Sequence, residues 1–159
     1  MHGQVIDFVS SCPREFATVV EIGSRDINGT VRGLFTAESY TGIDLYEGPG
    51  VDVVGDCLDW SPPEPVDAVV CCEVLEHAPD AEGIVRRAHE WLRPGGTLIL
   101  TCATDPRSAH SGISEQPWKP GEFYRNVKPD DMRSWLDGFD VRRLEVGPPG
   151  DLRVLAVKE

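Results

Sequence analysis

Residues 66–102 read VDAVVCCEVLEHAPDAEGIVRRAHEWLRPGGTLILTC, and this stretch decides the fold class. Its two ends, 67–72 and 97–102, are largely apolar, as in sheet strands that are covered on both faces. Between them, apolar residues recur at helical spacing over 82–92, and Arg93-Pro94-Gly95-Gly96 then stops the helix. The stretch therefore predicts a strand, a helix and a second strand that runs parallel to the first.

The same alternation extends through the chain. Apolar runs at 17–22, 39–45 and 51–54 precede this unit, so we expect an α/β domain with a mainly parallel sheet. A short amphipathic helix is expected around Val5–Val9, another over 129–136, and a further helix that starts near Asn28 or Gly29. The runs 139–146 and 152–157 flank the turn residues 147–151 and predict a hairpin. We expect residues 1–159 to form a single domain.

Composition narrows the classes of function. The chain has 159 residues and a formal net charge of −12, which disfavours a long nucleic-acid partner. It lacks an apolar run of the roughly 20 residues that a membrane helix needs, so no membrane association is expected, and a cytoplasmic location follows. Its five cysteines contain no Cys-x-x-Cys pair, so we expect reduced thiols, no disulfide framework and no metal site.

Acidic residues follow several of the predicted strands. Glu21-Ile22-Gly23 ends the first, Asp44 the second and Asp56 the third. The carboxyl ends of parallel strands meet at one edge of a sheet, where ligands bind. A carboxylate at Asp44 is placed to accept hydrogen bonds from both hydroxyls of an adenosine ribose, although a solvent-exposed acid is the alternative. Asp56 could receive the exocyclic amine of adenine.

These pieces resemble the class I methyltransferases that use S-adenosylmethionine. The matching segments are Val-Val-Glu-Ile-Gly (19–23), Gly-Ile-Asp-Leu (42–45), Gly-Asp (55–56), residues 67–77 and Leu-Arg-Pro-Gly-Gly-Thr-Leu (92–98). The resemblance implies a three-layer αβα sandwich with a mainly parallel seven-stranded sheet, strand order 3-2-1-4-5-7-6, and a C-terminal antiparallel hairpin. One departure is that Arg25 and Ile27 stand where the family commonly has glycine.

The resemblance also implies a site. Glu21 and Gly23 would cradle the methionine part of S-adenosylmethionine, Asp44 the ribose and Asp56 the adenine, with 72–77 beside the methionine part and the acceptor. Arg25 would either reach the methionine carboxylate or lie in solvent. The full set of predicted cofactor-binding residues is Glu21, Gly23, Ser24, Arg25, Asp44, Leu45, Asp56, Cys57, Cys72, Glu73, Val74 and His77.

The acceptor side is less well defined. His77, His110 and Tyr124 are the predicted catalytic residues, with Asp105 a further candidate for proton removal. His77 could instead order its loop through backbone hydrogen bonds. The long segment 103–128 should overhang the crevice, where Trp118, Phe123 and Arg125 would contact the acceptor or cap the core.

We therefore expect methyl transfer to an oxygen or nitrogen atom of a small-molecule acceptor. The alternative is a catalytically silent domain that binds S-adenosylmethionine as a sensor or partner subunit. A homodimer or a partner subunit is possible in either case. A nicotinamide-dependent oxidoreductase is disfavoured because the chain lacks a Gly-x-Gly-x-x-Gly turn.

Overall fold

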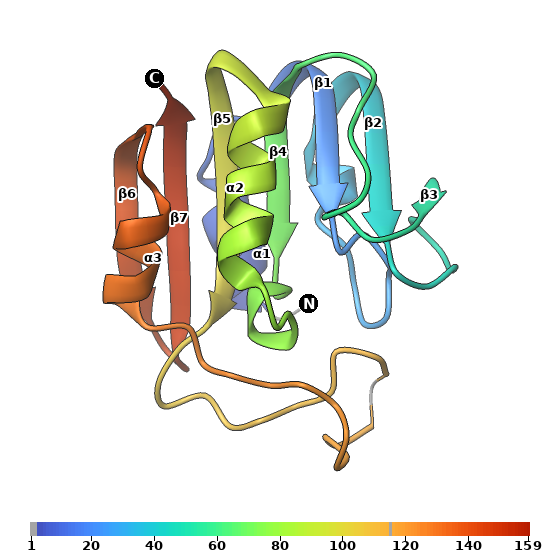
Figure 1. Ribbon diagram of the computed structural model, residues 1–159, viewed down its shortest axis with the longest axis vertical. Helices are drawn as coiled ribbons and strands as arrows, with labels where there is room; N and C mark the ends of the chain where they lie inside the picture. The colour runs from blue at the N-terminus through green and yellow to red at the C-terminus, as the bar shows by residue number, and fades with distance from the viewer. Residues whose placement is uncertain (1–2, 115) are drawn as a thin grey trace.

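The computed structural model describes residues 3–114 and 116–159, and its sheet confirms the predicted fold class. Seven strands lie in the order β3-β2-β1-β4-β5-β7-β6 (Figure 1). The strands are β1 (Glu15–Ile22), β2 (Thr36–Asp44), β3 (Val53–Val54), β4 (Val66–Cys72), β5 (Leu92–Ala103), β6 (Phe139–Gly147) and β7 (Asp151–Lys158). The helices are α1 (Gly3–Ser10), α2 (Ala81–Trp91) and α3 (Pro129–Trp135), with 3-10 turns η1 (Arg32–Leu34) and η2 (Leu75–His77).

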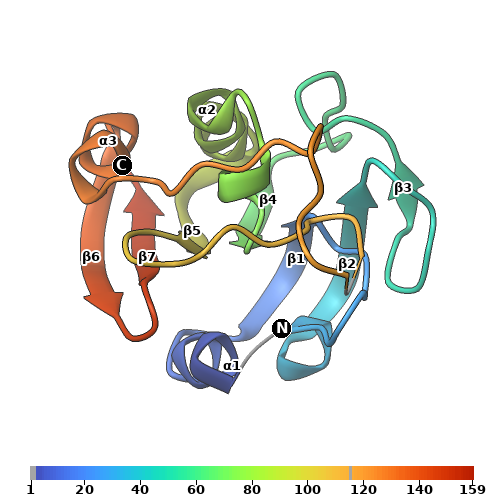
Figure 2. The same ribbon diagram turned by 90° about the horizontal axis from the view of Figure 1, so that it is seen from below.

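Strand β4 lies at the centre of the sheet, and all of its residues are buried. Successive side chains of a strand point to opposite faces. Val69 and Cys71 therefore join the core under α2, while Ala68 and Val70 join a second core with α1. Figure 2 shows α2 and α3 on one face of the sheet and α1 on the other, which gives the predicted three layers.

Helix α2 confirms the central prediction. The Asp80 side chain accepts a hydrogen bond from the Gly83 backbone N–H at 2.9 Å, which caps the helix at its start. Ile84, Val85 and Ala88 face the core. No helix within residues 3–114 and 116–159 combines the length and the apolar character that crossing a bilayer requires.

The helix expected from Asn28 or Gly29 was predicted wrongly. Between β1 and β2 the described chain forms only the three-residue turn η1. The Asp26 carboxylate accepts a hydrogen bond from the Gly29 backbone N–H at 2.7 Å, which stabilises a turn in place of a helix start. The following glycines, together with β-branched Thr30 and Val31, disfavour helix propagation, and β2 begins earlier than predicted. Helix α1 covers this face instead.

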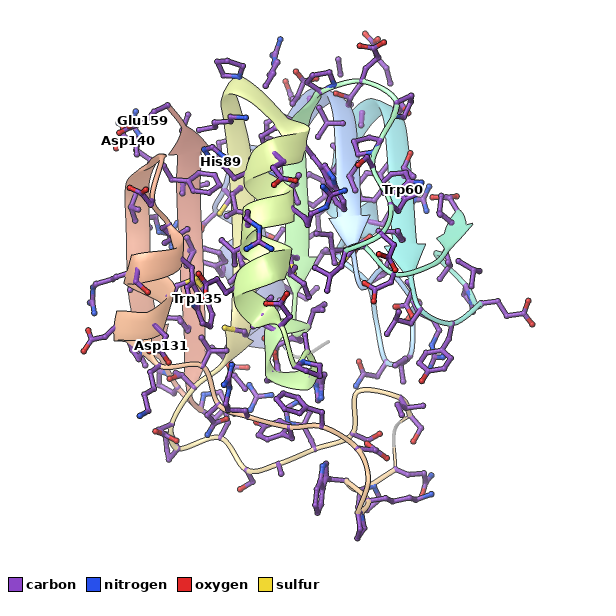
Figure 3. All side chains as sticks on the ribbon, viewed as in Figure 1. Trp60, His89, Asp131, Trp135, Asp140 and Glu159 are labelled. Carbon is purple, nitrogen blue, oxygen red and sulfur yellow. The ribbon has the colours of Figure 1, made fainter. Side chains whose placement is uncertain are left out.

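The predicted C-terminal hairpin is present, and β7 pairs antiparallel with both β5 and β6. The Lys158 ammonium donates hydrogen bonds to the His89 and Leu92 carbonyls, both at 2.8 Å. The His89 ring packs edge-on against Phe139, with ring centroids 4.9 Å apart. Figure 3 labels His89 at the C-terminal end of α2. These contacts join the hairpin to the C-terminal end of α2.

The start of β4 is joined to β1 by a buried acid. The Asp67 carboxylate accepts hydrogen bonds from the Thr18 backbone N–H at 2.7 Å and from the Thr18 hydroxyl at 3.0 Å. In return, the Asp67 backbone N–H donates to that hydroxyl oxygen at 2.9 Å. Because hydrogen bonds to a charged group are stronger than neutral ones, this contact aligns the two central strands.

Candidate functional site

The carboxyl ends of the parallel strands open into one cavity of about 570 Å³. Residues that follow β1, β2, β3 and β4 line one side of it, and the segment after β5 closes the other side. Figure 2 shows that segment crossing below the strand ends. A cavity at the carboxyl edge of an open α/β sheet is the expected place for a ligand.

The cavity gathers most of the residues that the sequence singled out. Of the predicted cofactor-binding residues, those that line it are Gly23, Arg25, Asp44, Leu45, Asp56, Cys57, Cys72, Glu73, Val74 and His77. His110 and Phe123 line it from the covering segment. Glu21, Ser24, Asp105, Trp118, Tyr124 and Arg125 are not among the lining residues. The roles of all these residues remain predictions.

The turn after β1 requires glycine at position 23. Gly23 has a φ of +73°, and a Cβ atom there would lie 2.2 Å from Cγ2 of Val74. Its backbone N–H donates to the Ile43 carbonyl at 2.9 Å. The backbone of this turn therefore passes close to the loop after β4, which leaves the cavity open where a side chain would otherwise enter.

Asp44 is held in place by backbone groups. Its carboxylate accepts hydrogen bonds from the backbone N–H of Arg25 at 3.2 Å and of Tyr46 at 3.0 Å. A carboxylate has about four lone-pair positions, so these two bonds leave roughly two for a ligand. The guanidinium of Arg25 donates to the Ile113 carbonyl and lies 5.2 Å from the centre of the Tyr46 ring.

Asp56 lies at the outer end of the cavity with an exposed side chain. Its carboxylate accepts a hydrogen bond from the Leu58 backbone N–H at 2.8 Å. That bond fixes the turn after β3.

Glu21 points to the opposite face of the sheet, away from the cavity. Alternation along β1 sends Ile22 toward the α2 core and Glu21 toward β2, where the Tyr40 hydroxyl donates to its carboxylate at 3.0 Å. Burial raises the pKa of Glu21 to about 7, against the lowering effects of the Tyr40 hydrogen bond and the Arg32 charge. Glu21 is not among the residues that line the cavity, and its contact with the cofactor stays a prediction.

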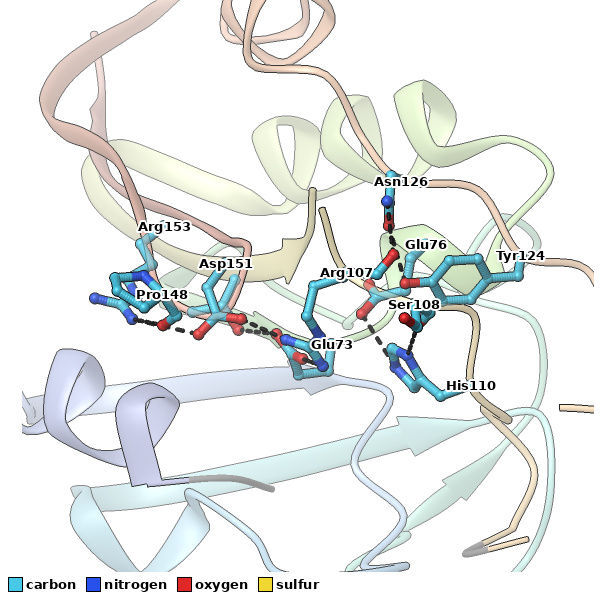
Figure 4. Close-up of polar contacts among 11 residues, drawn as sticks. Glu73, Glu76, Arg107, Ser108, His110, Tyr124, Asn126, Pro148, Asp151 and Arg153 are labelled. Atoms are coloured by element: carbon cyan, nitrogen blue, oxygen red, sulfur yellow. Dashed lines mark hydrogen bonds and ion pairs between the residues drawn. The ribbon is translucent and has the colours of Figure 1, made fainter. Parts of the chain in front are cut away.

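A buried ion-pair network borders the cavity beside β4 (Figure 4). The Arg107 guanidinium bonds to Glu73 at 3.2 Å and to Asp151, and Arg153 bonds to the other oxygen of Asp151 at 3.3 Å. Glu73 has a φ of +58°, and its carboxylate also accepts a hydrogen bond from Thr101. Sequence analysis missed Arg107 and Asp151 because only folding brings these distant positions together.

Three of the predicted catalytic side chains meet at the covered end of the cavity. The ring of His77 lies 4.9 Å from that of His110 and 5.5 Å from that of Tyr124, and the last two are 5.0 Å apart, all edge-on. Burial, and next the charge of His110, lower the pKa of His77 to about 4. His77 is therefore neutral at physiological pH. The Tyr124 hydroxyl donates to Asn126 at 2.9 Å.

Glu76 lies under these rings, and sequence analysis did not select it. It is fully buried, and its Oε1 lies 3.8 Å from Nε2 of His110 (Figure 4). Burial, and next the charge of Glu73, raise the pKa of its carboxyl group well above the usual range. The sequence signal that could have identified Glu76 is its position between Glu73 and His77, which were both predicted to bind the cofactor and which both line the cavity.

Comparison with known proteins adds independent information. The family model described as "Methyltransferase domain" matches residues 2–144. A ubiquinone biosynthesis O-methyltransferase of Pseudomonas entomophila is 28% identical over 128 residues, which cover 64% of this chain and 55% of that protein. A ubiquinone biosynthesis O-methyltransferase of Xanthomonas campestris pv. campestris is 34% identical over 92 residues, which cover 53% of this chain and 38% of that protein. The chain thus spans about half the length of the curated relatives it matches.

Solved structures share the fold. The N-methyltransferase NodS of Bradyrhizobium japonicum, solved with S-adenosyl-L-homocysteine, superposes with a TM-score of 0.69 and 16% identity over 98% of this chain and 84% of NodS. Magnesium protoporphyrin IX methyltransferase of Synechocystis, solved with bound S-adenosylmethionine, superposes with a TM-score of 0.66 and 18% sequence identity. The match covers 98% of this chain and 79% of that protein. At these identities the likeness establishes the fold alone.

Proposed function

The chain belongs to the class I methyltransferases that depend on S-adenosylmethionine, and from that premise we propose that it moves a methyl group to an oxygen or nitrogen atom of a small acceptor. The observation that carries the proposal is the single cavity lined by Gly23, Asp44 and His77 at three neighbouring strand ends. Because the curated relatives are named O-methyltransferases, we favour a hydroxyl acceptor.

The residues present fit the cofactor. At about 570 Å³ the cavity lies within the range of roughly 300–1,000 Å³ typical of ligand sites. The turn at Gly23 has no side chain to obstruct a ligand backbone, and a Cβ atom there would collide with Val74. Asp44 keeps acceptor positions free after its two backbone bonds.

S-adenosylmethionine supplies a methyl group on a positively charged sulfur, which is already activated for transfer. The protein therefore has to bind the two reactants, orient them and exclude water. We assign the ribose to Asp44, the methionine part to the turn at Gly23 and the adenine to Asp56. The covering segment contributes His110 and Phe123 to the cavity lining, and we assign to it the exclusion of water from the reactants.

The acceptor belongs at the covered end, beside His77 and His110. The lowered pKa of His77 keeps its imidazole neutral at pH 7, so one ring nitrogen presents a lone pair. Such a nitrogen can take a hydrogen bond from an acceptor hydroxyl and hold its oxygen in one orientation. Tyr124 packs against both imidazole rings and keeps them in place.

We also propose that the protein is located in the cytoplasm and that its acceptor is a small molecule. All five cysteines are free and buried, which fits a reducing compartment. The net charge of −12 opposes the approach of a long nucleic acid.

The test is calorimetric titration with S-adenosylmethionine and S-adenosylhomocysteine. Asp44→Ala should weaken binding by about 1.5–3 kcal/mol, roughly a tenfold to a hundredfold loss, if its carboxylate holds the ribose. Asp59→Ala is the matched control, because it removes an exposed carboxylate outside the cavity lining. Failure of both ligands to bind the wild-type chain would overturn the proposal.

A turnover assay distinguishes an active methyltransferase from a catalytically silent domain that only binds the cofactor. Wild-type protein should release S-adenosylhomocysteine with at least one member of a panel of small hydroxyl and amine compounds. Tight cofactor binding without turnover on any of them would favour the silent, cofactor-binding alternative.

A further inference from the structure

Three potential metal ligands converge at the covered end of the cavity. One ligand atom from each of Glu76, His77 and His110 lies within 4.8 Å of the other two. Glu76 and His77 come from turn η2, and His110 comes from the segment after β5. Figure 4 shows the Glu76 carboxylate directed toward the His110 ring.

The Glu76 side chain is buried without an oppositely charged partner at hydrogen-bond distance. It is 0% exposed, its carboxyl group lies beside the backbone N–H groups of Glu76 and Ala103, and no described side chain forms a hydrogen bond with it. Buried carboxylates are normally paired with a charged group or bound to a metal. The 3.8 Å between its Oε1 and Nε2 of His110 is too long for a hydrogen bond.

That distance suits two ligands of one ion. Oxygen and nitrogen ligands lie roughly 2.0–2.2 Å from a bound transition metal, so neighbouring ligand atoms are about 3–4 Å apart. The 3.8 Å separation meets this condition. Because no two of the three ligand atoms are more than 4.8 Å apart, bringing all of them to this separation takes a shift of less than about 1 Å.

The imidazole rings are already oriented as metal ligands are. Nδ1 of His110 lies 3.2 Å from the Ser108 carbonyl, which leaves Nε2 to face Glu76. His77 has a backbone hydrogen bond with Phe123. A histidine that binds a metal usually donates its other ring N–H to a carbonyl or carboxylate in this way.

We propose that Glu76, His77 and His110 bind one divalent first-row transition-metal ion, which faces the cavity beside the methyl acceptor. Two imidazole nitrogens and one carboxylate form a donor set typical of Zn²⁺, Fe²⁺ or Mn²⁺ with positions left open for other ligands. The neighbouring Arg107 does not oppose a cation strongly, because its guanidinium pairs with Glu73 and Asp151.

The role of the ion rests on the proposed methyl transfer, although its binding does not. With the ion bound, the free ring nitrogen of His77 is a metal ligand, and the ion takes the place of that nitrogen in holding the acceptor hydroxyl. A hydroxyl that binds a divalent cation has a lowered pKa, so its proton leaves to water at neutral pH. The ion therefore selects acceptors that carry a hydroxyl group. Its open positions suit a compound with two adjacent oxygen atoms.

The experiment is calorimetric titration of metal-free protein with ZnCl₂ and MnCl₂, together with visible absorption after CoCl₂ addition. We expect one ion per chain with at least one of these salts. Glu76→Gln should weaken binding at least tenfold and change the Co²⁺ spectrum. Asp130→Asn removes the same charge from an exposed acid, so it should bind within about twofold of wild type.

Two additional measurements keep the result decisive. Glu76→Gln should still bind S-adenosylhomocysteine, and this binding serves as the evidence that the variant folds. If Glu76→Gln does not fold, His110→Gln is tested for metal binding instead. Absence of one-to-one binding, or equal binding by wild type and Glu76→Gln, overturns the proposal. If the ion binds but wild-type protein does not bind S-adenosylhomocysteine, the methyltransferase function fails and the metal site stands.

Discussion

Substitution of Gly23 tests how the turn after β1 shapes the cavity. Gly23→Ala places a Cβ on a residue with a φ of +73° and 2.2 Å from Cγ2 of Val74. A left-handed conformation costs an alanine about 1–2 kcal/mol. The collision adds about 1–3 kcal/mol, because Val74 must change rotamer or the turn must move. We expect the free energy of unfolding to fall by about 2–5 kcal/mol in total.

Movement of the turn also displaces the Gly23 N–H from the Ile43 carbonyl. Affinity for S-adenosylhomocysteine should therefore fall about tenfold or more, measured by calorimetry. Urea denaturation gives the stability, with Val74→Ala and the double variant completing a thermodynamic cycle. The double variant should recover the collision energy and retain the conformational cost.

Two results would refute this reasoning. The first is that Gly23→Ala matches wild type in both stability and affinity, which would mean that neither the collision nor the backbone conformation matters. The second is that the double variant is as stable as Val74→Ala alone, which would show that the left-handed conformation at this position costs nothing.

Two other predictions concern stability. Burial raises the pKa of Glu21 from near 4.5 to about 7, so the folded state binds the Glu21 proton more tightly than the unfolded chain does. The free energy of unfolding should therefore decline by up to about 3 kcal/mol as the pH rises through that interval. Glu21→Gln should remove that decline in urea titrations at pH 5 and pH 8, and an unchanged slope would contradict it. Asp67→Ala leaves the Thr18 backbone N–H and hydroxyl without their acceptor, so it should lower the unfolding free energy by about 2–3 kcal/mol; a loss under about 0.5 kcal/mol would show that water replaces the carboxylate.

The agreement between sequence and structure is closest where one local pattern determines an element. The apolar period of 82–92 predicts α2, and the structure has it at Ala81–Trp91. The continuous apolar run 67–72 predicts a strand buried on both faces, and β4 is such a strand. The helix predicted after Gly29 failed because that segment has weak helical periodicity and a competing turn at Asp26.

By itself, the sequence determined the succession of strands along the chain and the position of helix α2, and it placed Gly23, Asp44 and His77 at or just after strand ends, because periodicity and parallel topology are local or general properties. Only the tertiary structure decided which side chains meet. It turned Glu21 to the far face and joined Arg107 to Glu73 and Asp151 across 34 and 44 positions. Such contacts depend on three-dimensional packing between distant segments, and no spacing along the chain encodes them.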